Sequence, residues 1–258
     1  MIISLYFARF TVPLTYVEGR LHLERKNKSR FILFFARFAL PLQKRKKKME
    51  VIETAIQGAY IIEPRVFEDA RGYFFESFSQ REFDEKVYPV TFVQDNESMS
   101  RYGVMRGLHF QRPPYTQSKL MRCVRGAVLD VAVDIRKGSP TYGQHVACLL
   151  CGRDEEGKKI AEQFEQESIT ANLSPLTGKI GLQFFIPKGM AHGFAVLSDI
   201  AVFQYKCDEF YHPEADGGIC ILDNSLGIDW RIPTAQAILS DKDTKHPLLQ
   251  DFDSPFTF

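Results

Sequence analysis

The chain has 258 residues, of which 45% are hydrophobic and 25% are charged, as in one globular domain with an appendage. Residues 1–48 carry twelve Lys and Arg against two Glu, so residues 49–258 have a net charge of −9 within a total of +1. An acidic main body argues against nucleic acid as a partner of the fold. No uncharged apolar run approaches the roughly 18 residues of a membrane helix, so no membrane partner is expected either.

The five cysteines are an odd number and show no disulfide-framework spacing. This usage is typical of the reducing cytoplasm, where thiols stay free. The first residues also lack a secretory pattern, because no small-residue cleavage site follows a continuous apolar core. We therefore expect a cytoplasmic protein.

The first 48 residues do not read as part of a fold. The text "YFARFTVPL" at 6–14 recurs as "FFARFALPL" at 34–42, and the segment ends in "KRKKKM". A polybasic run beside aromatic residues is suited to anionic membranes or nucleic acid. The interpretation that we favour is a misassigned start, with Met49 as the natural first residue, because "MEVIETAIQGAYIIEP" reads as an ordinary beginning. The predicted domain is 49–258.

From Val51 onward, the chain reads as short β runs separated by turn residues. Among these runs, helix-prone text is sparse: "SQREFDEKV" after Ser79 and "TAQAIL" near the C-terminus. The clearest strand spans Val128 to Ile135, where apolar residues alternate as in a half-buried antiparallel strand. This pattern predicts an all-β sandwich or jelly-roll barrel with a few short helices. The β-prone runs, in order, are "AYIIEPRVF", "GYFFESF", "VTFVQDN", "KLMRCV", "AVLDVAVDI", "HVACLLC", "GLQFFIP", "GFAVL" and "IAVFQYKC".

One segment, 152–179, interrupts these runs. It is polar and charged, and its middle is helix-prone. Because loop-closure entropy grows slowly with length, such insertions cost little. We predict a surface excursion inserted into a hairpin turn.

The stretch "RGLHFQ" places a titratable His109 and a cationic Arg106 on a predicted strand. In a regular strand these two side chains would point to opposite faces. Gly107 permits a bulge that would bring both to one pocket. A structural histidine is the alternative, and for His109 taken by itself it is the commoner case.

Further polar groups lie in or beside β runs: Lys119, His192 and Tyr205. Tyr205 shares strand parity with Phe203 and Cys207, so its ring is expected inside the barrel. Each residue alone is ordinarily structural or solvated. Together with His109 they supply a base, a cation and a weak acid, the groups needed to remove and return a proton beside a carbonyl.

Metal binding is the competing use of such histidines. The sequence has no H-x-H pair, and His109, His145 and His192 are widely separated. "HVACLLC" offers His145, Cys148 and Cys151, but the two cysteines have opposite strand parity. We therefore predict no metal site. With no glycine-rich phosphate loop, a phosphate would be held by Arg and Lys side chains.

Ordered blocks of the sequence from about residue 50 onward resemble the dTDP-4-dehydrorhamnose 3,5-epimerase family. The blocks are "EPRVFEDARGYFFESF", "TFVQDNESMS", "RGLHFQ", "KLMRCVRGAVLDVAVDIRKGSPTYG", "FIPKGMAHGFAVLS", "YKCDEFYHPEADGGI", "LGIDW" and "LSDKD". The resemblance implies a dimeric cupin-type jelly roll (a double-stranded β-helix) that uses neither metal nor organic cofactor. It also implies inversion of C3 and C5 of dTDP-4-dehydro-6-deoxy-D-glucose to give dTDP-4-dehydro-L-rhamnose, in dTDP-L-rhamnose biosynthesis.

By the same resemblance, His109 is the general base oriented by Asp243, Tyr205 is the acid, and Lys119 faces the C4 oxygen. The implied nucleotide-sugar site contains Arg71, Glu76, Gln94, Asp95, Asn96, Arg106, Lys119, His192, Asp216 and Lys242. Early strands around Arg71 and Glu76 are expected to reach into the partner's site of a homodimer.

Three features depart from the family pattern: Ser118 replaces a glycine, segment 152–179 is long, and residues 1–48 have no counterpart. The alternative functions are a mono-epimerase or ketoisomerase on a related dTDP-4-keto sugar. A metal-dependent cupin, such as an oxygenase, and a binding protein without turnover are the alternatives from other classes.

Overall fold

The computed structural model describes residues 14–17, 20–23, 49–167 and 179–258. The chain divides into two units, Met1–Lys47 and Lys48–Phe258. In the first unit, β1 (Leu14–Val17) and β2 (Arg20–Leu23) pair as an antiparallel hairpin. The rest of the basic extension lies outside the described residues.

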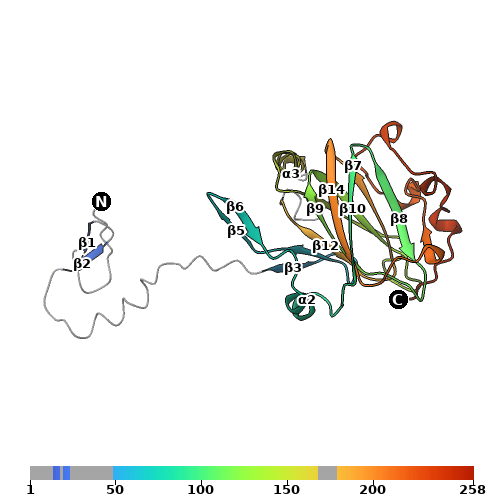
Figure 1. The fold of residues 1–258 in the computed structure, drawn as a ribbon, viewed down its shortest axis with the longest axis horizontal. Coiled ribbons are helices and arrows are strands. Elements are labelled where there is room, and N and C mark those ends of the chain that lie inside the picture. The colour runs from blue at the N-terminus through green and yellow to red at the C-terminus, as the bar shows by residue number, and fades with distance from the viewer. Residues whose placement is uncertain (1–13, 18–19, 24–48, 168–178) are drawn as a thin grey trace, which may run out of the picture. The chain divides into compact units, whose positions relative to one another are not determined.

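The second unit is built on two large antiparallel sheets (Figure 1). The six-stranded sheet has the order β3 (Glu50–Glu53), β4 (Tyr60–Glu63), β12 (Gln183–Ile186), β9 (Lys119–Arg125), β14 (Ile200–Cys207) and β7 (Gln94–Arg101). The five-stranded sheet has the order β11 (His145–Cys151), β10 (Ala127–Asp134), β13 (Met190–Val196), β8 (Met105–Gln111) and β15 (Asp216–Gly218).

The core between the sheets takes side chains from both of them. Phe184 and Phe203 of the six-stranded sheet are buried in one cluster with Val128, Leu150 and Phe194 of the five-stranded sheet. Alternation along each strand sends these residues inward, and sheets buried face to face form a sandwich. The predicted all-β jelly roll is confirmed.

Strand β10 departs from the expectation of a half-buried strand, because all eight of its residues are buried. Val128 and Ala132 face the core between the sheets. Leu129 and Val131 belong to a second cluster on the opposite face, and the chain after β15 covers that face with residues such as Trp230. The strand alternates between two apolar environments, and its outer face is covered by a segment without regular strands.

The prediction for segment 152–179 is wrong in one respect. Strand β11 pairs with β10, whereas β12 pairs with β4 and β9, so the segment connects the two sheets and does not close a hairpin. Its helix-prone middle forms α3 (Glu155–Glu167). Ala161 and Phe164 of this helix are buried against Leu149 and Cys151 of β11. Residues 168–178 lie outside the described part of the chain.

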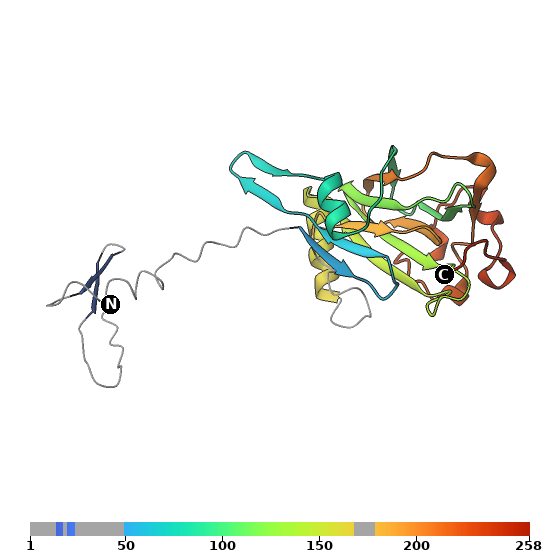
Figure 2. The ribbon, with the colours of Figure 1, turned by 90° about the horizontal axis from the view of Figure 1, so that it is seen from below.

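The other predicted helix after Ser79 is present as α2 (Gln80–Lys86), which buries Phe83. The text "TAQAIL" forms only one 3-10 turn, η4 (Thr234–Gln236). The hairpin of β5 (Val66–Asp69) and β6 (Gly72–Phe75) projects away from the sheets (Figures 1 and 2). Within the described residues, no helix has the length and apolar character needed to cross a bilayer.

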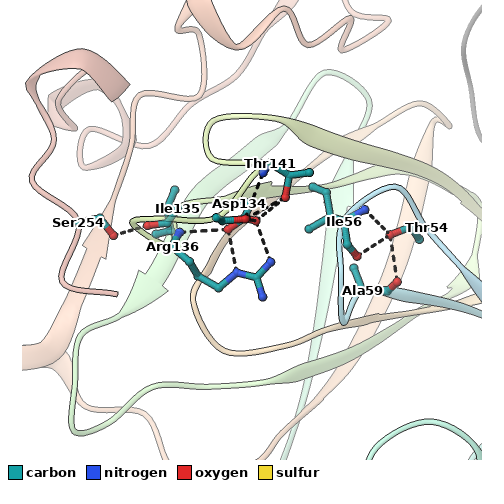
Figure 3. Close-up of polar contacts among 9 residues, drawn as sticks. Thr54, Ile56, Ala59, Asp134, Ile135, Arg136, Thr141 and Ser254 are labelled. Carbon is teal, nitrogen blue, oxygen red and sulfur yellow. Dashed lines mark hydrogen bonds and ion pairs between the residues drawn. The ribbon is translucent and has the colours of Figure 1, made fainter. Parts of the chain in front are cut away.

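The end of β10 is held by a polar network around the buried Asp134 (Figure 3). Its carboxylate accepts hydrogen bonds from Arg136 Nε at 2.8 Å, Ser139 Oγ at 2.6 Å and Thr141 Oγ1 at 2.7 Å. Burial opposes ionisation of Asp134, but these donors outweigh it and lower the pKa of the carboxyl to about 2. Next to it, Ser254 donates a hydrogen bond to the Ile135 carbonyl, which fixes the C-terminal segment to the sheet.

Candidate active site

The candidate site lies between the two large sheets. Strands β8, β13 and β15 of the five-stranded sheet form one wall, and strands β7, β14 and β9 of the six-stranded sheet form the other. His109 comes from β8 and is partly exposed, with 30% of its side chain accessible. Tyr205 lies on β14 and packs against the core between the sheets, on the same face as Phe203. Lys119 is the first residue of β9 and pairs in register with Cys207 of β14.

A bulge at Gly107 brings Arg106 and His109 to one face. On β13, His192 is opposite His109 and Phe194 is opposite Arg106, so two residues of β8 stand against the single Gly193. Opposed residues share a face of the sheet, and His192 and Phe194 lie two residues apart, so all four point inward. Gly107 has a φ of +129°, and a Cβ there would lie 2.5 Å from Gly193 Cα. The bulge expected from the sequence is present.

His109 and Asp243 form a dyad across 134 residues of sequence. His109 Nε2 lies 2.6 Å from Asp243 Oδ1, and Asp243 begins the 3-10 turn η5 (Asp243–Lys245). Burial opposes the charge on Asp243, but the hydrogen bond and the charge of His109 keep the pKa of this carboxyl below its usual value. An ionised carboxylate on Nε2 orients the ring and leaves Nδ1 as the free lone pair of the neutral imidazole.

Tyr205 and Lys119 lie together on the opposite wall. The Lys119 ammonium is 5.9 Å from the centre of the Tyr205 ring. Burial raises the pKa of the Tyr205 phenol, so it stays protonated at neutral pH, and Arg106 acts in the opposite direction. Burial also lowers the pKa of the Lys119 ammonium, while Cys207 and Asp130 oppose that effect. The wall therefore carries a proton donor beside a partly buried cation.

His192 is held by a buried carboxylate that the sequence reasoning did not assign to the site. Its Nε2 lies 2.6 Å from Asp130 Oδ1, and both side chains are buried. Burial lowers the pKa of His192, Asp130 opposes this, and Lys119 adds to it. The sequence carries a signal for this buried carboxylate, because Asp130 is a charged residue in the middle of an apolar strand.

The mouth of the site carries several polar side chains. Arg106 Nη2 donates to Ser100 Oγ of β7 at 3.1 Å, which connects the two sheets. Asp216 forms an ion pair with Lys242 and accepts a hydrogen bond from the Tyr211 hydroxyl at 3.3 Å. Ser100 and Tyr211 were not expected from the sequence, because only the fold places them beside Arg106 and Asp216.

Strand β7 divides the predicted residues Gln94, Asp95 and Asn96 between its two faces. Gln94 Nε2 donates to Asn96 Oδ1 at 3.0 Å, and Asn96 contacts Cys207 Sγ at 3.8 Å, so both face inward. Asp95 has the opposite parity and pairs with Lys206 at 2.9 Å on the outer face. The structure therefore does not bring the Asp95 side chain to the other site residues.

Arg71 and Glu76 are also separated from the site within this chain. Arg71 lies at the tip of the β5–β6 hairpin, where its exposed guanidinium pairs with Asp69 at 2.6 Å. Glu76 directly follows β6. The hairpin extends away from the sheets (Figure 2).

Metal-ligating side chains come together at one place in the described residues. His109, Asp243 and His246 each offer a ligand atom, and these atoms lie within 4.8 Å of one another. His145, Cys148 and Cys151 form no such group among the described residues. The five cysteines are free thiols.

Comparison with known proteins identifies the family. The family described as dTDP-4-dehydrorhamnose 3,5-epimerase matches residues 53–167 and 169–251. The dTDP-4-dehydrorhamnose 3,5-epimerase of Escherichia coli (strain K12) is 48% identical over 198 residues, which cover 76% of this chain and 92% of that protein. This chain belongs to the dTDP-4-dehydrorhamnose 3,5-epimerase family.

Solved structures of family members have the same fold. The dTDP-6-deoxy-D-glucose-3,5-epimerase of Legionella pneumophila Philadelphia 1, in complex with dTDP-4-keto-L-rhamnose, is 43% identical with a TM-score of 0.66. The match covers 80% of this chain and 95% of that one. A double mutant of a 3'-monoepimerase from Streptomyces bikiniensis, in complex with dTDP, is 30% identical with a TM-score of 0.62, over 77% of this chain and 87% of that one.

The serine that departs from the epimerase pattern is tied into the fold. Ser118 is buried beside Lys119, and its backbone N–H donates to Asp208 Oδ1 at 2.6 Å. The Asp208 N–H returns a bond to the Ser118 carbonyl at 3.3 Å. This pair of bonds holds the backbone at the start of β9, from which Lys119 extends.

Proposed function

We propose that this chain is a cofactor-independent epimerase that inverts C3 and C5 of dTDP-4-dehydro-6-deoxy-D-glucose. The product is dTDP-4-dehydro-L-rhamnose, so the enzyme serves dTDP-L-rhamnose biosynthesis. Membership in the dTDP-4-dehydrorhamnose 3,5-epimerase family supports the assignment of this substrate. The observation that carries the chemistry is the His109–Asp243 dyad on one wall, with Tyr205 and Lys119 on the other.

Each inversion begins with proton removal beside the C4 ketone. His109 Nδ1 takes the proton, since Nε2 is held by Asp243. The electron pair of the broken C–H bond moves to the C4 oxygen, forming an enolate. Lys119 stabilises that negative charge in a site of reduced dielectric. Asp243 stabilises the imidazolium that results.

The second half of each inversion returns a proton to the other face. Tyr205 donates its hydroxyl proton to the same carbon, and the enolate electrons re-form the ketone. The raised pKa of Tyr205 keeps the proton available until the carbanion needs it. Solvent then restores the protonation of both residues. Two opposed walls are required, and the space between two sheets supplies them.

The sugar nucleotide is held by residues of both protomers of a homodimer. Arg106, Asp216, Lys242, Gln94, Asn96 and His192 bind it from the chain that holds the base. Arg71 and Glu76 enter from the partner's hairpin. This assembly is supported by the exposed aromatic side chains of that hairpin, Phe74 at 68% and Tyr73 at 53%. Such residues are enriched where a protein meets a partner.

Deuterium exchange tests the reaction directly. The protein is incubated with the 4-keto sugar nucleotide in deuterated water, and the product is followed by NMR. Label at both C3 and C5 is expected, because each inversion exchanges a carbon-bound proton with solvent. Absence of label at both carbons contradicts the proposal.

The same experiment separates the second candidate, a mono-epimerase. The relative from Streptomyces bikiniensis, described as a 3'-monoepimerase, favours keeping this candidate. Label at a single carbon identifies it. A ketoisomerase would instead give a product in which the carbonyl has moved. A metal-dependent cupin would contain stoichiometric metal and would lose activity on chelation, which elemental analysis and EDTA treatment test.

We also propose that residues 1–48 lie outside the folded enzyme, and that it works in the cytoplasm. The free thiols support a reducing compartment. The concentration of positive charge in the first 48 residues supports the separation, because the folded part is acidic.

A further inference from the structure

His246 is a polar side chain that the proposed reaction does not use. Its side chain is 12% exposed, and its Nε2 atom is buried without a hydrogen-bond partner. That atom lies 3.8 Å from Asp243 Oδ1. The ring meets the edge of the His109 ring, with the ring centres 5.8 Å apart. A buried nitrogen without a hydrogen-bond partner is costly, so Nε2 of His246 is suited to hold a ligand.

The ring of His246 is seated on strand β15. A Cβ on Gly218 would lie 2.5 Å from His246 Nε2, so only a glycine leaves room for the ring here. Gly218 is also the register partner of His109. The backbone of β15 therefore sets His246 beside the His109–Asp243 dyad.

These three side chains match the ligand set of a transition-metal ion. Zn²⁺ takes imidazole nitrogen and carboxylate oxygen at about 2.0–2.2 Å, so two ligands on one tetrahedral ion lie about 3.3 Å apart. The dyad atoms are 2.6 Å apart and the His246–Asp243 atoms 3.8 Å apart, on either side of that value. All three ligand atoms lie within 4.8 Å of one another. Binding of one ion requires side-chain movements that bring these separations to about 3.3 Å.

The surrounding charge permits a cation. Asp243 supplies a carboxylate, and its negative charge partly balances that of a divalent ion. Lys242 is the neighbouring cation, and its ammonium is paired with Asp216. His109 is 30% exposed, which leaves a path for an ion and room for a water as the fourth ligand.

We propose that His109, Asp243 and His246 form an inhibitory site for Zn²⁺ and similar late transition-metal ions. The ion replaces the hydrogen bond between His109 and Asp243. Coordination through Nε2 of His109 places the one ring proton on Nδ1, which removes the lone pair needed to accept a proton from the sugar. The bound ion therefore stops the reaction without taking part in it, and its removal restores turnover.

The site is selective by ligand type. Two imidazoles and one carboxylate favour Zn²⁺, Cu²⁺ and Co²⁺ over Mg²⁺ and Ca²⁺, which prefer oxygen ligands. Micromolar Zn²⁺ is expected to inhibit the wild-type protein, with full recovery in EDTA, whereas millimolar Mg²⁺ is not. Equal inhibition by Mg²⁺ contradicts a site of this kind.

The decisive comparison uses His246→Gln, with each variant referred to its own rate in EDTA. The Zn²⁺ concentration that halves the rate should rise at least tenfold. The matched control is His212→Gln, since His212 also lies beside a carboxylate, Glu214, at 3.0 Å. That control should keep wild-type sensitivity. Unchanged sensitivity in His246→Gln, or lost sensitivity in His212→Gln, overturns the assignment.

Metal binding can be measured without turnover, so this test does not depend on the proposed function. Only the inhibition rests on that function. Co²⁺ added to the wild-type protein should give the visible absorption of a low-coordinate nitrogen-ligated ion, and Zn²⁺ should displace it. His246→Gln should lose this signal, and so should Gly218→Ala, which keeps all three ligands but displaces the His246 ring. If the wild-type protein gives no signal, or if both variants retain it, the site is refuted whatever the enzyme's substrate.

Discussion

His109 and Tyr205 have different roles in the proposed reaction, so their replacements should differ in kind. His109→Ala removes the one base and should abolish both exchange and inversion. Tyr205→Phe keeps the ring but removes the donated proton, so inversion should fall while exchange from the original face continues. Deuterium exchange and product formation, measured in parallel on each variant, separate the two outcomes. If Tyr205→Phe loses both to the same extent, Tyr205 is not a separate acid.

Among elements, the connection after β10 should carry a large part of the acid sensitivity of the fold. The pKa of Asp134 is about 2 in the folded protein and near 3.8 in an unfolded chain, so the folded state favours the ionised form. This contribution is complete above about pH 4 and is lost as the pH falls through 3.8 toward 2. The linked free energy is about 2 kcal/mol.

The variant Asp134→Asn tests that contribution. Its free energy of unfolding in urea should be about 2 kcal/mol lower at pH 6, and the difference from wild type should shrink as the pH approaches 2. Asp253→Asn is the matched control, because Asp253 forms an ion pair with Lys137 at a side-chain exposure of 94%. Exposed pairs contribute little, so the control should remain near wild type. A pH-independent loss in Asp134→Asn would show that its ionisation is not the cause.

For the whole molecule, completion of each site by the partner's hairpin predicts complementation. A chain with Arg71→Ala and a chain with His109→Ala should each be weakly active or inactive alone. In a mixed dimer, the intact His109 of one chain meets the intact Arg71 of the other, so one of two sites is restored. Random mixing by co-expression should therefore give about a quarter of the wild-type rate. No recovery in isolated mixed dimers means that Arg71 does not act across the interface.

A chain that begins at Met49 tests the separation of residues 1–48. Its turnover, its mass in solution and its thermal midpoint should match those of the full chain, because the unit that holds the site begins at Lys48. The three quantities are measured side by side under the same conditions. A truncated chain that loses the dimer or the activity would show that the basic segment is structural.

Much of the sandwich and part of its site follow from local sequence. Alternation along Val128–Ile135 predicts a strand in any context, because successive side chains point to opposite faces. Gly107 predicts a bulge because a residue without a Cβ tolerates the irregular backbone that a bulge needs. The parity of Tyr205 with Phe203 places its ring inward for the same local reason. Such features depend on neighbours within a few residues, which the sequence shows directly.

The tertiary structure alone decided the features that depend on distant contacts. Asp130 meets His192 across 62 residues, and His246 joins the His109–Asp243 dyad only because β15 lies beside β8. The family resemblance implied the contact of Asp243 with His109 across 134 residues, which no local pattern predicts. The burial of the outer face of β10 also depends on residues that are distant in the sequence. The chain after β15 folds back over that face, and burial there depends on distant residues and not on the periodicity of the strand itself. The register of β7 against β14 also places the side chain of Asp95 on the outer face. Periodicity specifies on which side of a strand a residue lies, whereas pairing and packing decide what that side meets.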